Sequence, residues 1–138
     1  MAIRERKDNG SSTDQSSIEF ITGWHDPENW NETLTRWMDD DAAVIVYSEV
    51  NRSANLSLRA QSFARPRSLA LSSEAIPEVR LNVTTELADL NQSISLTKGE
   101  NLIRFRVPEG CEKPCDMPEL NSSDCRCLSV AAQNLIIT

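Results

Sequence analysis

From Phe20 onward, the chain consists of short segments in which apolar and polar residues alternate. Turn-forming residues interrupt these segments at intervals of about eight to twelve residues. A period of two residues is that of a β-strand with one buried face, and the short intervals leave no room for crossover helices between parallel strands. The pattern therefore predicts an all-β fold, an antiparallel β-sandwich of about eight strands.

The alternation also places the individual strands. In residues 55–63, for example, Leu56, Leu58 and Ala60 alternate with polar residues. The other predicted strands lie in 33–38, 42–48, 69–71, 79–83, 94–96, 103–107 and 128–137. The acidic run 39–41 is predicted to turn the chain between the first two of these, as a hairpin connection. A bulge is expected in the last strand near Ala131 and Ala132, where the alternation is imperfect.

The first residues of the chain differ from the rest. Residues 1–18 are polar and have neither a helical nor a strand period, so we expect a disordered tether or a vector-derived remnant. Residues 19–138 are then a single folded domain, which is long enough to bury its own core.

All four cysteines lie close together, at Cys111, Cys115, Cys125 and Cys127. An even number in one short segment favours two disulfides that staple the loop 111–127. A bridge between Cys125 and Cys127 would strain the backbone, and we favour the nested pairing of Cys111 with Cys127 and Cys115 with Cys125. A tetrahedral zinc site and free thiols are the alternatives, although the spacing lacks the paired C-x2-C of common zinc sites.

The chain has seven Asn-x-Ser/Thr sequences, the acceptor pattern for N-glycosylation. They begin at Asn9, Asn31, Asn51, Asn55, Asn82, Asn91 and Asn121. So many acceptors indicate a surface exposed to a glycosylating compartment, the alternative being chance in Asn- and Ser-rich turns. Disulfides point the same way, since they persist outside the cytosol. We therefore expect the chain to lie on the extracytoplasmic face of the cell membrane.

Neither a membrane-spanning run nor the apolar region of a signal peptide is visible in the sequence. The expectation that follows is a piece of a larger membrane protein, whose other segments provide export and anchoring. The net charge of −7 and the lack of a basic patch argue against nucleic acid as a partner.

Catalytic patterns are missing from the sequence. His25 is the only histidine, and there is no G-x-S-x-G, H-E-x-x-H or glycine-rich phosphate loop. Asp26 with Glu28, or the run 39–41, could act as paired glycosidase carboxylates. The same run could bind calcium, but it lacks the regular spacing of a calcium loop. We expect a noncatalytic domain without a cofactor or a metal.

Aromatic and basic residues are the candidates for ligand binding. Trp37 falls in a strand pattern and is expected in the core, whereas Trp24 and Trp30 lie in a polar segment and are either core residues or stack on sugar rings. The triplet 65–67 either contacts an anionic group or pairs with nearby carboxylates. The predicted ligand-binding residues are Trp24, His25, Asp26, Trp30, Arg65 and Arg67, and the expected partner is a glycan or a lipid-linked saccharide.

Several short motifs occur in a familiar order. They are Gly23-Trp24, Glu28, Arg36-Trp37-Met38, Ser62-Phe63 with Pro66-Arg67, and Leu96-Thr97-Lys98-Gly99-Glu100-Asn101. This order resembles the C-terminal β-sandwich domain of archaeal and bacterial polytopic membrane glycosyltransferases, of the dolichyl-phosphate-mannose and oligosaccharyltransferase type. The resemblance implies an outward-facing domain without catalytic residues of its own, because in that family the catalytic acids belong to the membrane portion. The cysteine-rich loop departs from the family pattern.

The expected function combines these points: a noncatalytic, glycan-binding-like accessory domain of a membrane glycosyltransferase. The expected sandwich is of jelly-roll or immunoglobulin-like type, similar to carbohydrate-binding modules, and monomeric. A structural or adhesive ectodomain of a cell-envelope or surface-layer protein is the alternative.

Overall fold

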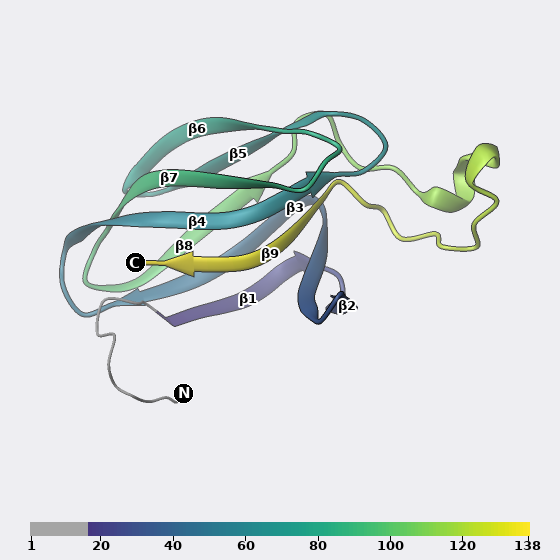
Figure 1. Ribbon diagram of the computed structural model, residues 1–138. Coiled ribbons are helices and arrows are strands. Elements are labelled where there is room, and N and C mark those ends of the chain that lie inside the picture. Colours follow the sequence, from purple (N-terminus) through teal and green to yellow (C-terminus); the bar gives the residue numbers. More distant parts are fainter. Residues whose placement is uncertain (1–16) are drawn as a thin grey trace.

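In a computed structural model, which describes residues 17–138, the chain is an antiparallel β-sandwich of nine strands (Figure 1). The strands are β1 (Ser17–Trp24), β2 (Glu28–Trp30), β3 (Thr33–Ser48), β4 (Arg52–Ser62), β5 (Arg67–Ser73), β6 (Ile76–Val83), β7 (Ala88–Leu96), β8 (Gly99–Arg106) and β9 (Val130–Ile137). Two short 3₁₀ turns, η1 (Pro114–Asp116) and η2 (Pro118–Leu120), lie in the loop before β9. The predicted fold class is thus confirmed.

Two sheets form the layers of the sandwich. Sheet I has the strand order β1-β3-β8-β5-β6, and sheet II has the order β2-β3-β9-β4-β7. The strand β3 belongs to both, because its first half pairs with β2 and β9 and its second half pairs with β1 and β8.

The predicted hairpin at the acidic run 39–41 is therefore wrong, since these residues continue β3 from one sheet into the other. Backbone hydrogen bonds hold the crossing: Ser129 N donates to Met38 O, and Val107 N donates to Asp40 O. One of the acidic side chains has a cationic partner, as Arg104 Nη2 lies 2.7 Å from Asp41 Oδ2. A strand that bends from one layer into the next is a common way to form the corner of a sandwich.

Alternate side chains fill the space between the sheets, as the sequence pattern requires. Val44, Ile103 and Phe105 of sheet I and Leu56 and Ile137 of sheet II are each 0% exposed. Burial of such side chains is worth about 1.5–3 kcal/mol each, which makes this layer the main source of stability.

Two details of the predicted strands shift. Ser17 and Ile18, assigned above to the tether, belong to β1 and pair with Tyr47 and Val46; the rest of the predicted tether, residues 1–16, lies outside the described residues. The bulge in β9 is displaced from the predicted position to Asn134, whose φ of 53° interrupts the register between β9 and β4. No helix in residues 17–138 is long and apolar enough to cross a membrane.

Candidate functional site

A tight hairpin presents Trp30 at one end of sheet II. The strands β2 and β3 pair in register, with Trp30 opposite Thr33. Between them, Asn31 and Glu32 have φ values of 52° and 68°. Two consecutive residues with positive φ form the type of two-residue turn that matches the twist of paired strands. The hairpin thereby holds Trp30 on the outer face of the sheet rather than in the core.

Three aromatic rings form a row on this face, which we call the aromatic row: Trp30, Trp37 and Phe63. The ring centroids of Trp30 and Trp37 are 5.7 Å apart, and those of Trp37 and Phe63 are 5.9 Å apart, both in edge-to-face contact. Such contacts add about 0.5–1.5 kcal/mol each beyond the burial of area. The small side chain of Ala131, packed in the same cluster, leaves room for the rings. Trp37 is buried, whereas Trp30 and Phe63 are only partly buried.

A chain of polar contacts fixes the orientation of Trp30. Its Nε1 donates to Glu28 Oε1 at 2.8 Å, and Arg126 Nη1 donates to Glu28 Oε2 at 3.2 Å. Arg126 is held in turn by Asp124, with 2.7 Å between Nη2 and Oδ2. Hydrogen bonds from Arg126 lower the pKa of Asp124 to about 2, and the same contacts raise the pKa of Arg126. Trp30 is therefore tied to the cysteine-rich loop that carries Asp124 and Arg126.

Two nested disulfides close that loop, which we call the cysteine loop (residues 111–127). Cys111 is bonded to Cys127 and Cys115 to Cys125, the pairing favoured from the sequence. No cysteine is free, which removes the zinc and free-thiol alternatives. The loop projects from the end of the sandwich at which β9 begins (Figure 1).

The basic triplet anchors the cysteine loop to the sandwich. Arg65 Nε and Arg67 Nη2 lie 2.7 and 2.6 Å from Glu112 Oε1, and the two arginines lower the pKa of Glu112, with Arg65 contributing more. The Arg67 side chain is 1% exposed and also donates to Phe63 O and Gly110 O. Of the two interpretations given for the triplet 65–67, pairing with carboxylates is therefore the one that the structure shows. The Arg67 side chain has no exposed surface with which to bind a ligand.

Trp24 does not join the aromatic row. Its ring packs edge-to-face on Phe20 and Phe105, and its Nε1 donates to Ala43 O at 2.9 Å. Gly23 allows this inward packing, because its backbone approaches Asp41 and Ala42 so closely that a Cβ would collide with them. Of the two interpretations given for Trp24, the structure therefore supports the one that places its ring against the core.

His25 and Asp26 also have different surroundings. His25 Nε2 lies 2.9 Å from Asp39 Oδ1 and 3.0 Å from Cys127 O, which links the β1–β2 connection to the base of the cysteine loop. Its carboxylate partner is thus Asp39 and not the adjacent Asp26, which is exposed. Within residues 17–138, no three His, Cys, Asp or Glu side chains gather as metal ligands.

The glycosylation candidates occupy different environments, except Asn9, which lies outside the described residues. Asn55 and Asn91 are diagonal neighbours on β4 and β7, with Asn55 Nδ2 3.4 Å from Asn91 Oδ1. Asn51 Oδ1 accepts a hydrogen bond from Lys98 N. The other three are Asn31 in the hairpin turn, Asn82 on β6 and Asn121 after η2, and all of the described candidates except the half-buried Asn55 are exposed.

The sequence missed several members of this site. Asp124 and Arg126 have no motif that marks them, and Phe63 is marked only as part of a framework motif. What brings these residues to Trp30 is the pairing of β3 with β9 and the disulfides. Conversely, Tyr47 is the one exposed aromatic side chain of the seven in the chain, and it lies away from the row, on the outer face of sheet I opposite Glu100.

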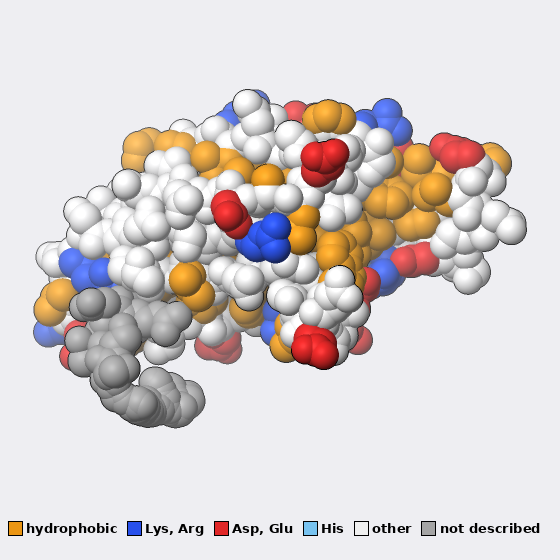
Figure 2. Space-filling model, in the orientation of Figure 1, with side chains coloured by type: hydrophobic (Ala, Val, Ile, Leu, Met, Phe, Trp, Pro, Cys, Tyr) orange, Lys and Arg blue, Asp and Glu red, His pale blue; other side chains and the backbone are white. Residues whose placement is uncertain are grey.

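The arrangement combines apolar rings with fixed hydrogen-bonding groups. Figure 2 shows an apolar surface that extends from this end of the sandwich to the cysteine loop, bordered by acidic and basic side chains. Aromatic rings offer a flat apolar contact to the C–H faces of a sugar, while carboxylate and guanidinium groups can bond to its hydroxyls. Among the described residues, the printed partners of His25 are Asp39 and the backbone oxygen of Cys127, and neither is a nucleophilic side chain of the serine or cysteine type.

No protein-family model matches the chain, and no curated protein matches it in sequence. Solved structures do match in fold. The C-terminal family 6 carbohydrate-binding module of a marine laminarinase from Zobellia galactanivorans has a TM-score of 0.51 at 10% identity, covering 89% of this chain and 98% of that one. A family 35 carbohydrate-binding module from Clostridium thermocellum has a TM-score of 0.52 at 10% identity, covering 88% and 90%.

A third structure, a carbohydrate-binding module from Cellvibrio mixtus lichenase 5A in complex with cellotriose, has a TM-score of 0.50 at 12% identity and covers 91% of both chains. At these identities the likeness is one of fold. The chain has the β-sandwich fold of carbohydrate-binding modules.

Proposed function

We propose that the domain is a noncatalytic glycan-binding module and that the aromatic row is its binding surface. The observation that carries the proposal is Trp30, a partly buried indole at the surface that is held in one orientation by Glu28, which is itself held by Arg126. A ligand that stacks on an already oriented ring loses less conformational entropy on binding. The fold shared with carbohydrate-binding modules, one of them in complex with cellotriose, supports the same chemistry.

The proposed setting is the outer face of a membrane, as an accessory domain that holds a glycan or lipid-linked saccharide near a glycosyltransferase. Two disulfides support an oxidising compartment. The setting beyond that rests on the resemblance of the framework motifs, since no family or sequence match connects the chain to such an enzyme. A parent gene that encodes several membrane spans would support this part of the proposal, and one that encodes only repeated β-domains would contradict it.

The binding surface can be tested with one pair of variants. Isothermal titration with neutral oligosaccharides should give weaker binding in Trp30→Ala by about tenfold, which corresponds to about 1.4 kcal/mol. Tyr47→Ala removes an exposed aromatic ring from the other sheet and should leave the affinity unchanged. Loss of affinity in Tyr47→Ala but not in Trp30→Ala would move the site to sheet I. If the unsubstituted chain bound no saccharide, the result would favour the alternative function, a structural or adhesive domain.

A further inference from the structure

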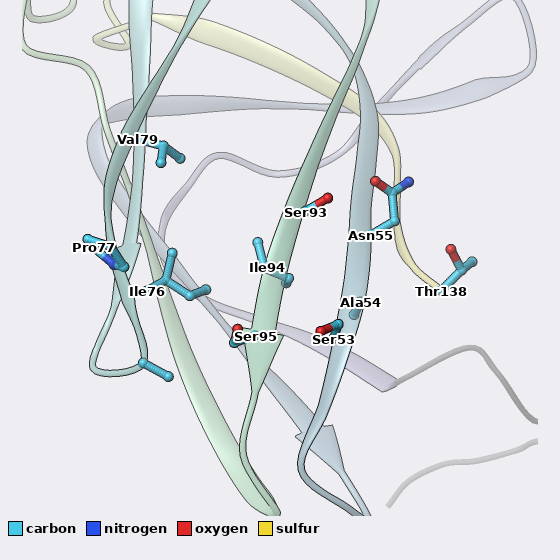
Figure 3. Close-up of a pocket in the computed structure, with 11 residues that line it drawn as sticks. Ser53, Ala54, Asn55, Ile76, Pro77, Val79, Ser93, Ile94, Ser95 and Thr138 are labelled. Carbon is cyan, nitrogen blue, oxygen red and sulfur yellow. The ribbon is translucent and has the colours of Figure 1, made fainter.

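A hollow lies away from the aromatic row, along the edge of the sandwich formed by β6 and β7. The strands β6 and β7 are the last strands of sheets I and II, and each pairs with only one neighbour among the described strands. Between them opens a cleft of about 590 Å³, which extends over the adjoining outer surface of β4 (Figure 3). This volume lies within the range of about 300–1,000 Å³ that is usual for ligand sites. We call this hollow the edge cleft.

One part of the edge cleft is apolar. Ile76, Pro77 and Val79 line it from β6, and Ile94 lines it from β7. Figure 3 shows Ile94 on the side of β7 that faces Ile76 and Val79. Pro77 is exposed and Val79 is half-exposed, so the cleft offers apolar contact area to a ligand.

The other part is polar and uncharged. Ser93 and Ser95 of β7, Ser53 and Asn55 of β4, and Thr138 line it. Side chains alternate along a strand, so these residues face outward while Ile94 faces inward. The hydroxyls of Ser53, Ser93 and Ser95 have no hydrogen-bond partner among the described residues. They are free to bond to a ligand.

The absence of charge is informative about the ligand. Charged residues make up 25% of the chain, but none of the described residues that line the edge cleft is charged. An anionic ligand would lose hydration there without gaining a cationic partner, which is unfavourable. A neutral sugar has apolar C–H faces and a rim of hydroxyls, and so matches the two parts of the cleft.

A peptide strand fits this edge less well. Adding a strand to β6 requires its free backbone N–H groups, and Pro77 has none. Proline on an edge strand is one of the features by which proteins prevent strand addition.

We infer that the edge cleft is a second saccharide site, selective for neutral oligosaccharides. This inference rests on the proposed glycan-binding function and adds a site to it. Because the two sites share no residue, each can be removed without the other.

The test is a titration of the full chain followed by NMR, with cellotriose, laminaritriose and β-1,3-galactotriose as probes. The amide signals of Ser93 and Ser95 report on the edge cleft, and the indole signal of Trp30 reports on the aromatic row. At least one probe should shift Ser93 and Ser95 saturably, and trigalacturonate should bind there at least tenfold more weakly. Saturable shifts there with trigalacturonate alone, or with none of the three neutral probes, would overturn the inference.

Variants separate the two sites. Ser93→Arg places a bulky charged side chain in the cleft and should weaken binding there at least tenfold, with the Trp30 response unchanged. Ser57→Arg is the matched control, because Ser57 lies on the same outer face but does not line the cleft, and Arg59 already occupies a like position. Equal loss in both variants would contradict the cleft. Shifts at Trp30 alone would reject the inference but leave the proposed function; shifts at the cleft alone would reject the aromatic row as the binding surface.

A final titration uses a peptide of alternating valine and threonine, which tests whether a peptide strand binds at the edge cleft instead of a sugar. It should not shift Ser93 or Ser95. If it does so more strongly than all three sugars, the cleft is a strand-addition site and the inference is wrong.

Discussion

The aromatic row and the edge cleft are two regions of one sandwich, and they are built in opposite ways. At the aromatic row, disulfides, arginine–carboxylate pairs and edge-to-face rings fix each side chain. At the edge cleft, the described lining residues are uncharged, and several of them come from β6 and β7, each of which pairs with only one described strand. The difference indicates that one end of the molecule is organised before a ligand arrives, whereas the other offers a simple surface of hydroxyls and apolar side chains.

The largest difference should appear on truncating the centre of the aromatic row. Trp37 is 7% exposed and contacts both other rings, so Trp37→Ala should destabilise the fold by about 3–5 kcal/mol. Ser95→Ala in the edge cleft should change stability by no more than about 0.5 kcal/mol. Urea unfolding of both variants gives the comparison. Similar losses would mean that the two regions are equally integrated into the core.

Removal of the outer disulfide comes next. Cys111 and Cys127 are 16 residues apart, and closing such a loop is worth about 3 kcal/mol. The double variant Cys111→Ser, Cys127→Ser should lose about that much and should also weaken binding at Trp30, because Arg126 lies inside the loop. Removing Cys115 and Cys125, which are 10 residues apart, should cost less. Unchanged Trp30 binding after loss of the outer bridge would show that the cysteine loop does not position the ring.

A smaller loss of stability is expected at low pH. The pKa of Asp124 is about 2 in the folded chain, below its ordinary 3.8, and the pKa of Glu112 is also lowered. Groups with a depressed pKa stabilise the fold above their unfolded pKa and cease to do so as the pH falls through the folded value. The urea midpoint should therefore be steady down to about pH 5 and fall between about pH 4 and 2.

The Asp124→Asn variant should show a smaller fall over the same range. The edge cleft, whose described lining includes no titratable side chain, should keep its affinity for a neutral sugar down to about pH 4. An equally large fall in the variant would assign the acid sensitivity to carboxylates elsewhere.

The sequence was sufficient for the layers of the fold and for little of the site. Alternation placed Leu56 and Leu58 inward because one buried face leaves a period of two in any strand. It failed at Asp39–Asp41, where a turn and a strand crossing between sheets look alike until Ser129 and Val107 supply the hydrogen bonds. The composition of this segment favours a turn, but hydrogen bonds from the backbone of distant residues hold it as part of a continuous strand.

The tryptophans show the same limit. Trp24 and Trp30 have similar polar neighbours, yet Trp24 packs on Phe105 and Trp30 bonds to Glu28. The position of each ring depends on residues about eighty to a hundred positions away, including Arg126. A single sequence does not show that these residues lie close to the tryptophans. The edge cleft was missed because β4, β6 and β7 contribute ordinary serines and aliphatic residues that form a hollow only when the two sheets stack.

The side-chain NMR signals of the three tryptophans test the central claim most directly. In a titration with neutral oligosaccharides, the indole signal of Trp30 should shift saturably, and that of Trp24, whose Nε1 bonds to Ala43 O inside the sandwich, should stay in place. A Trp24 signal that moves as much as that of Trp30, or a Trp30 signal that stays fixed while sugar binds elsewhere, would contradict the assignment of the aromatic row as the glycan-binding surface.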